Sequence, residues 1–212
     1  MGVKERRERE KSEIREKILD AARELFINQG YEGVSMRKVA EKIEYSPTAI
    51  YIHFADKEEL FHELCHQDFA RLAEVFQSAA IPEDPVERLK QIGRMYIDFG
   101  MRYPNHYKLM FMTSHPALQM MDERDCEIKG NPEVDAYAFL KLTVQQAMDA
   151  GCFREDLTDA EMLSQTLWAA VHGVISLQIA KGKDPWVEWR SVEQRTELML
   201  DAIMRGLLLE AK

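Results

Sequence analysis

At 212 residues the chain is long enough for one large domain or two smaller ones. Hydrophobic residues make up 46% of it, with only ten glycines and seven prolines, which favours a mainly helical protein with a substantial core. No apolar run approaches the roughly 18 residues of a membrane span, the N-terminus is charged rather than apolar, and three cysteines at unrelated spacings suggest no disulfide framework. We therefore expect a cytoplasmic protein with reduced thiols and no membrane segment.

The net charge of −9 is unevenly distributed along the chain. Residues 1–60 carry 12 basic and 13 acidic groups, whereas the remainder carries 16 basic and 24 acidic groups. Phosphate contacts need a local basic surface and not a basic protein, so the acidic remainder does not exclude a nucleic-acid-binding function.

Residues 1–13 alternate basic residues with glutamates and have almost no apolar content. One interpretation is a solvated extension of the first helix. The other is a basic arm that follows DNA phosphates or enters a minor groove, with the four basic side chains Arg6, Arg7, Arg9 and Lys11.

The first core helix is predicted from residue 14 to Gly30, which would end it as a C-terminal glycine. Its apolar positions recur at helical spacing: Ile14, Ile18, Ala21, Ala22, Leu25 and Phe26.

Three helix starts are crowded into residues 35–60. Ser35 can cap one helix, Ser46 followed by Pro47 is typical of a second start, and Asp56 with Glu59 resembles a capping box. The middle helix, 47–53, has about two turns and cannot be stable alone, so its neighbours must hold it. Two helices joined by a short turn are typical of a helix-turn-helix, although an ordinary helical hairpin has the same local pattern.

The pattern Ser-x-Arg-x-Val-Ala-x-x-Ile-x-Tyr-Ser-x-Thr-x-Ile-Tyr-x-x-Phe-x-x-Lys-Glu-x-Leu resembles the DNA-binding signature of the TetR family of transcriptional regulators. The resemblance covers about residues 14–64. It implies an all-α fold with a three-helix helix-turn-helix domain at 1–60, including the extension 1–13, and a helical effector-binding and dimerisation domain at 61–212. Glu44 stands where the family usually has glycine, and a positive φ is costly for glutamate, so we expect a slightly rebuilt turn.

Side chains with suitable donors or apolar groups are predicted to contact DNA: Ser35, Arg37, Pro47, Thr48, Ala49, Tyr51, Ile52, His53 and Lys57. Arg37 has the forked donors that bind guanine in two places, while hydroxyl and imidazole groups suit phosphates and the small apolar groups suit thymine methyls. Lys57 opposes the dipole of the helix that it starts, and the resemblance implies that it contacts a phosphate.

The next helix, predicted at about 57–79, contains His62-Glu63-Leu64-Cys65-His66, which matches the zinc metallopeptidase motif H-E-x-x-H. A catalytic zinc site also needs a third ligand, and no downstream carboxylate stands out. Metallopeptidase activity and a structural metal site at His62, Cys65 and His66 stay open as alternatives, beside ordinary helix residues, and no cofactor is predicted.

Further helices are predicted at 85–102, at 107–112, at 132–150 with Asn131 as its cap, from a capping box at Thr158–Glu161 to about 180, and at 191–209. Residues 113–131 are weakly patterned and suggest a partly helical, mobile connection.

The last two helices, at about 159–180 and 191–209, are more apolar than one flank of a bundle requires, which suggests a partner surface. Their apolar residues include Ala169, Ala170, Val174, Leu177 and Ile179, then Leu198, Leu200, Ile203, Leu207 and Leu208. In the family the last two helices form a four-helix dimer interface, so the resemblance implies a homodimer. Trp168-x-x-x-His172-Gly173 also resembles the Trp…His-Gly signature of one C-terminal subgroup.

Twelve methionines and many aromatic residues could line an apolar pocket, although such stripes are more often plain core. The predicted lining residues are Phe76, Tyr96, Phe99, Tyr107, Phe111, Phe139, Trp168 and His172. The sequence therefore predicts a homodimeric repressor that leaves a palindromic operator when a small, largely apolar effector binds. A helical adaptor that does not bind DNA is a third possibility.

Overall fold

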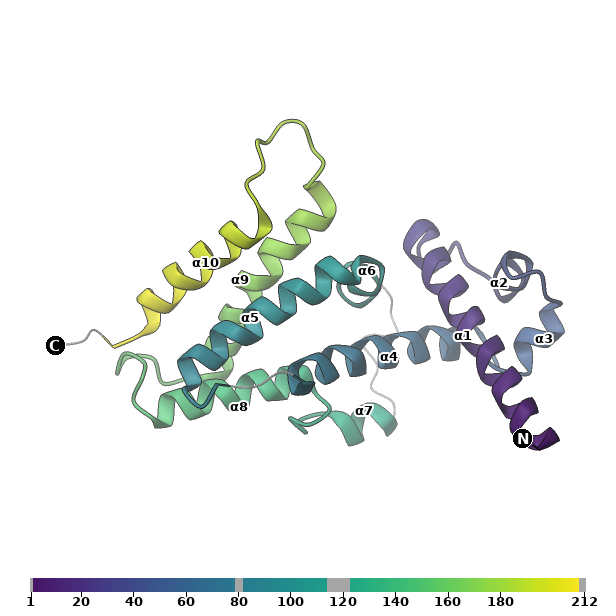
Figure 1. The fold of residues 1–212 in the computed structure, drawn as a ribbon, viewed down its shortest axis with the longest axis horizontal. Coiled ribbons are helices and arrows are strands. Elements are labelled where there is room, and N and C mark those ends of the chain that lie inside the picture. The colour runs from purple at the N-terminus through teal and green to yellow at the C-terminus, as the bar shows by residue number, and fades with distance from the viewer. Residues whose placement is uncertain (1, 79–81, 114–122, 210–212) are drawn as a thin grey trace. The chain divides into compact units, whose positions relative to one another are not determined.

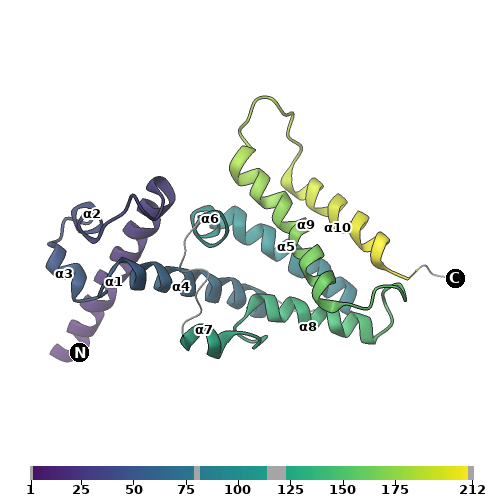
Figure 2. The same cartoon turned by 180° about the vertical axis from the view of Figure 1, so that it is seen from behind.

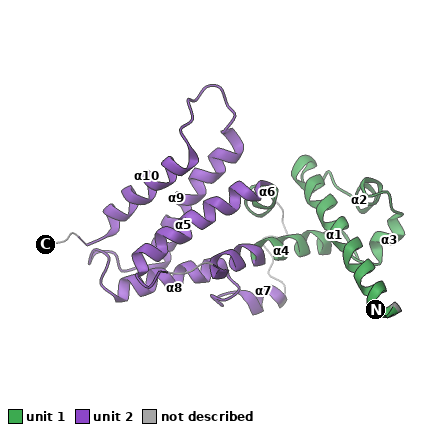
Figure 3. Ribbon diagram, viewed as in Figure 1, with its two compact units in different colours: residues 1–69, 105–123 green, residues 70–104, 124–212 purple. Residues whose placement is uncertain are grey.

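The computed structural model describes residues 2–78, 82–113 and 123–209. The chain divides into two compact units, which Figure 3 colours separately: unit 1 comprises residues 1–69 and 105–123, and unit 2 comprises residues 70–104 and 124–212. The helices are α1 (Val3–Gln29), α2 (Met36–Lys42), α3 (Pro47–Tyr51), α4 (Lys57–Ser78), α5 (Pro85–Arg102), α6 (Pro104–Met112), α7 (Glu123–Ile128), α8 (Ala136–Asp149), α9 (Ala160–Lys181) and α10 (Val192–Leu207).

The all-α prediction is confirmed: over the described ranges the chain forms helices, with one isolated antiparallel bridge between Phe153 and Leu208. Within those ranges, no helix is both long enough and apolar enough to cross a membrane. The three cysteines are free thiols.

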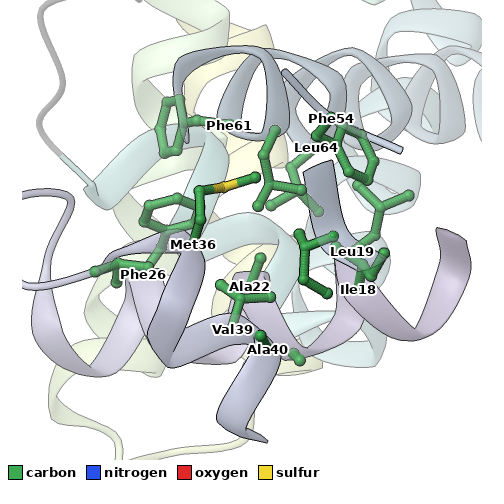
Figure 4. Packing of buried hydrophobic residues seen from close by; sticks show 14 of the residues in the cluster. Ile18, Leu19, Ala22, Phe26, Met36, Val39, Ala40, Phe54, Phe61 and Leu64 are labelled. Atoms are coloured by element: carbon green, nitrogen blue, oxygen red, sulfur yellow. The ribbon is translucent and has the colours of Figure 1, made fainter. Parts of the chain in front are cut away.

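Unit 1 is built around one face of α1, which packs against α2, α3 and the first turns of α4 (Figure 4). Its largest core side chains are aromatic: the rings of Phe26 and Tyr31 are stacked 5.5 Å apart, and Phe61 meets Phe26 edge-on at 5.1 Å. Leu109 of α6 belongs to the same core. Burial of these side chains holds the two short helices, which are too short to be stable by themselves.

A buried ion pair joins α1 to α4 within unit 1. The Arg23 guanidinium donates to both carboxylate oxygens of Asp68, at 2.9 and 3.3 Å, and Nδ1 of His106 lies 2.7 Å from the same carboxylate. A two-point contact between guanidinium and carboxylate fixes the angle between the groups, so this pair sets the register of α4 against α1.

Unit 2 is a helical layer in which α5 packs against α8, α9 and α10 (Figures 1 and 2). The helices approach closely at Gly93 of α5, where an added Cβ would lie 2.9 Å from Leu200 and 3.2 Å from Val171. Glycine is therefore favoured here by the limited space between three helices, and not by its backbone freedom.

Most predicted helix ends agree with the structure, but several do not. The helix predicted from Pro132 begins at Ala136, because Asp135 is the cap and Asn131 instead accepts from the Glu133 amide in a turn. The cap of α9 is Asp159 and not Thr158. The predicted helix 47–53 ends at Tyr51.

The N-terminal extension is helical from Val3, in agreement with the first of its two interpretations, and α6 begins at Pro104, three residues before its predicted start. The predicted partly helical connection at 113–131 contains α7, while residues 114–122 lie outside the described residues. The division into domains after residue 60 stays a prediction.

Candidate DNA interface and effector site

The turn between α2 and α3 is closed by a pair of backbone hydrogen bonds. The Tyr45 amide donates to the Ala40 carbonyl at 3.0 Å, and the Glu44 amide donates to the Glu41 carbonyl at 3.3 Å. This is the Schellman arrangement, whose left-handed position is usually glycine. Glu44 occupies that position with φ 60°, so the expectation of a rebuilt turn is wrong: the backbone keeps the turn and glutamate bears the strain.

The α3 helix is positioned by its own first residues and by two buried anchors. The Ser46 side chain accepts from the Ala49 amide, and Pro47 occupies the first helical position. Ile50 and Phe54 are buried in the unit 1 core. Their burial leaves the opposite face of α3 to solvent.

Two large apolar side chains stand at the end of that outer face: Tyr51, the last residue of α3, is 54% exposed, and Ile52, which caps the helix, is 69% exposed. Pro47 and Thr48 are also exposed, and Ala49 is half-buried. An exposed apolar group on a five-residue helix gains nothing for the fold, so this face is available for a partner.

The remaining predicted DNA contacts already have partners within unit 1. The Ser35 hydroxyl accepts from the Lys38 amide as the cap of α2, and the exposed Arg37 guanidinium pairs with Glu41 at 2.9 Å. The Lys57 ammonium donates to the Tyr31 carbonyl at 3.1 Å and lies 3.8 Å from the centroid of the Tyr31 ring. Lys57 thus also fixes the loop between α1 and α2, a role that the sequence did not indicate.

His53 lies just after α3 beside two basic side chains of α1. Burial lowers the pKa of His53, and the charges of Lys11 and Arg15 lower it further. The Arg15 guanidinium donates to the His53 carbonyl at 3.1 Å and lies 4.3 Å from the centroid of the Phe54 ring. The chain after α3 is therefore held against the α1 helix.

In the H-E-x-x-H segment of α4, Glu63 pairs with Arg15 at 3.1 Å. Cys65 belongs to the unit 1 core, and His62 and His66 are half-buried. Glu63 therefore joins α4 to α1 through an ion pair.

The predicted effector residues fall into both units. In unit 2, Nε1 of Trp168 donates to the Tyr96 hydroxyl at 3.0 Å, and that hydroxyl lies 3.2 Å from Nδ1 of His172. Burial lowers the pKa of His172, which favours the neutral imidazole that can accept from Tyr96. These three residues, from α5 and α9, form a polar group that we call the Tyr96 triad.

The other predicted lining residues form separate pairs. Within unit 2, the ring of Phe76 lies 6.2 Å from that of Phe139, and Phe99 is buried. Tyr107 and Phe111 belong to unit 1, with their rings 4.9 Å apart and Phe69 edge-on to Phe111 at 5.7 Å.

Sequence reasoning missed a polar group beside the Tyr96 triad. The Tyr137 hydroxyl donates to Glu161 at 2.6 Å, Lys141 pairs with the same carboxylate at 2.7 Å, and the Tyr137 ring lies 5.8 Å from Trp168. Burial and the Glu161 carboxylate raise the pKa of Tyr137 to about 12, while the hydrogen bonds from Lys141, Tyr137 and Gln165 lower the pKa of Glu161 to about 2. The one-turn spacing of Tyr137 and Lys141 on α8 was the available signal.

A surface hollow of about 570 Å³ lies at the turn between α9 and α10 and is lined by residues 178–186. It contains none of the predicted effector residues, so it does not identify their pocket.

The chain is similar to known proteins over both of its parts. A model of bacterial regulatory proteins of the tetR family matches residues 18–64, and a model of the tetracyclin repressor-like C-terminal domain matches residues 89–203. The second range includes the Trp168…His172-Gly173 segment.

Among relatives, the HTH-type transcriptional repressor AcnR of Corynebacterium diphtheriae is 44% identical over 69 residues, which are 32% of this chain and 36% of that protein. This chain thus spans only about a third of the length of the AcnR repressors that it matches. The HTH-type transcriptional regulator UidR of Escherichia coli K12 is 27% identical over 185 residues, 76% of this chain and 93% of UidR.

Two solved structures show the same fold. PfmR, a TetR family transcriptional regulator of Thermus thermophilus, superposes with a TM-score of 0.66 at 22% identity, covering 92% of this chain and 96% of PfmR. The fatty acid degradation regulator FadR of Bacillus halodurans has a TM-score of 0.67 at 16% identity, covering 90% of this chain and 94% of FadR.

The C-terminal model alone spans more than half of the chain, and the N-terminal model covers the helix-turn-helix described above. A family of DNA-binding regulators leaves the H-E-x-x-H match without an enzymatic role. The protein belongs to the TetR family of transcriptional regulators and is not an enzyme.

Proposed function

We propose that this protein is a cytoplasmic homodimeric repressor that binds a palindromic operator and is released from it by a small, largely apolar effector. The observation that carries the proposal is the exposed outer face of α3, whose Tyr51 and Ile52 side chains stand free of the unit 1 core. A helix that is held rigidly by buried anchors and presents its other face to solvent suits insertion into a major groove.

Arg37 and Tyr51 are the proposed main contacts of each half-site. The guanidinium of Arg37 is exposed, and its bond to Glu41 is a surface ion pair that costs little to exchange for guanine. The Tyr51 hydroxyl can donate to a phosphate while its ring covers the edge of the groove.

Dimerisation through α9 and α10 follows from apolar side chains that the single chain leaves exposed. Leu177 of α9 is 52% exposed and Leu198 of α10 is 72% exposed. A symmetric dimer would bury both leucines of each protomer. Its two α3 helices would need a separation of about 34 to 36 Å to enter successive major grooves.

The proposed effector site lies in unit 2, next to the Tyr96 triad. The triad would supply a polar contact, while other aromatic side chains of unit 2, namely Phe76, Phe99 and Phe139, would supply apolar contacts. The α4 helix contributes residues to both units, so an effector that shifts its unit 2 part could change the spacing of the two α3 helices. Release then requires only that the effector bind more tightly to the dimer with the altered spacing than to the dimer that fits the operator.

The test is a gel shift with the double variant Arg37→Ala/Tyr51→Ala. We expect the specific complex to be lost, because a bidentate base contact alone is worth about 1 to 3 kcal/mol per half-site, while sedimentation still shows a dimer.

The matched control is Arg102→Ala, which also removes an exposed arginine that is paired with an acidic residue one turn away, Asp98. The control should bind DNA like the wild type. Normal operator binding by the double variant would exclude this docking surface.

A further inference from the structure

The α1 helix extends beyond the core that it helps to build. Its buried face carries Ile18 and Ala22, and at 3.6 residues per turn the same face continues toward the N-terminus through Lys11, Arg7 and Lys4. Basic side chains thus replace apolar ones where the helix leaves the core. We call Lys4, Arg7 and Lys11 the basic stripe.

The other basic residues of the extension are already neutralised on a different face of α1. Arg6 pairs with Glu10 at 2.7 Å and Arg9 pairs with Glu13 at 3.7 Å, each one turn along the helix. Among the described residues, no ion pair is recorded for the basic stripe. The structure therefore divides the basic residues of this segment into two classes that the sequence could not separate.

The basic stripe lies on the α3 side of unit 1. Arg15, on the same side of α1 as Lys11, donates to the carbonyl of His53 directly after α3, and Lys11 is close enough to act on the His53 imidazole. Both ribbon views show α1 continuing past α3 toward its N-terminal end (Figures 1 and 2). A groove-bound α3 would bring the neighbouring phosphates toward this end of α1.

We propose that Lys4, Arg7 and Lys11 form a second DNA-binding element, which contacts the phosphate backbone beside the groove entered by α3. Lys4 and Lys11 are separated by about 10 Å along the helix, and over the same length of the DNA axis one strand presents about three phosphates. Most of the glutamates of the extension point away from this face, and Glu8 stands at its edge. This inference rests on the proposed DNA-binding function, and it extends the footprint without adding sequence preference.

The test compares two variants that remove the same charge from the same helix. Arg7→Ala/Lys11→Ala changes the basic stripe, and Arg6→Ala/Arg9→Ala changes the ion-paired face. Alanine is the best helix former, so the helix should persist in both, which circular dichroism checks. Binding to a 40-base-pair duplex that carries an operator selected with the wild-type protein is measured by fluorescence anisotropy from about 50 to 300 mM salt.

For the stripe variant, the slope of log Kobs against log salt should fall by about 1.8 per protomer, because each lost phosphate contact removes about 0.9. Binding to a random duplex should weaken in parallel, and the ion-paired variant should keep the wild-type slope. Equal slopes for the stripe variant and the wild type, or equal losses in both variants, would overturn the inference. If the wild type selects no operator at all, it is the proposed function that fails, and not this extension of it.

Discussion

Two helices of this protein end in the same backbone motif with different residues in its left-handed position. At the end of α8, Gly151 has φ 68°, and the Cys152 amide donates to the Ala147 carbonyl. At the end of α2, Glu44 has φ 60° with the equivalent pair of bonds. Glycine adopts this conformation without a steric cost, whereas an L side chain costs about 1 to 2 kcal/mol there. The helix-turn-helix therefore holds a strained residue beside the proposed DNA surface.

The first prediction concerns this strain. Glu44→Gly should raise the free energy of unfolding by about 0.5 to 1 kcal/mol, since relief of the left-handed strain exceeds the backbone entropy that glycine adds to the unfolded chain. Urea denaturation measures the change. The reciprocal control, Gly151→Ala, has open space for its Cβ and should lose about 1 kcal/mol from conformation alone. A less stable Glu44→Gly variant would show that the glutamate side chain contributes more than its backbone costs.

At this scale the sequence predicted buried residues better than it predicted polar partners. Ile18, Ala22 and Phe26 belong to the apolar stripe predicted for the first helix, and they are buried. The bond from Lys57 to the Tyr31 carbonyl joins residues 26 positions apart, and no local pattern encodes it. The Tyr137–Glu161 hydrogen bond likewise joins two helices whose packing must be known first.

The existence of each helix could be predicted because apolar spacing and capping residues act locally. The position of a helix end was harder to predict where two residues could both serve as its cap. Asn131 and Asp135 can both accept from amides that follow them, and the structure uses Asn131 for a turn and Asp135 for the helix. Thr158 and Asp159 are adjacent candidates, and the carboxylate of Asp159 accepts from two amides. A side chain that bonds two donors satisfies more of the free helix end than one that bonds a single donor.

The second prediction concerns the close packing of α5 against α9 and α10. Gly93→Ala should lower the free energy of unfolding by up to about 2 kcal/mol, because the overpacking cost of about 1 to 3 kcal/mol exceeds the gain in helix propensity of up to about 1 kcal/mol. The clash is with Leu200 and Val171, which are buried and cannot move freely.

Thermal unfolding of Gly93→Ala and the wild type in one buffer measures the change. A stable Gly93→Ala variant would mean that the three helices can move apart at little cost.

For the molecule as a whole, the sequence predicted two functional parts. It did not predict which segments, distant along the chain, belong to the core of each part. The core of unit 1 contains Leu109, and its buried ion pair includes His106, although both residues follow α5 in the chain. Tyr107 and Phe111, predicted to line an effector pocket, accordingly belong to unit 1. These contacts depend on where α6 packs in the folded protein. Residue spacing within a segment carries no information about that position.

The final prediction tests the proposed assembly. Leu198→Asp should convert the dimer to a monomer in sedimentation and lower operator affinity by at least about tenfold, because a charge placed in a buried apolar interface is costly and one protomer contacts only one half-site. The matched control is Leu142→Asp on α8, where a leucine that is 41% exposed is replaced by the same charge outside the proposed interface. It should remain dimeric and bind DNA normally. A dimeric Leu198→Asp variant would place the subunit contact elsewhere, whereas a monomeric variant with full operator affinity would show that one protomer suffices for binding.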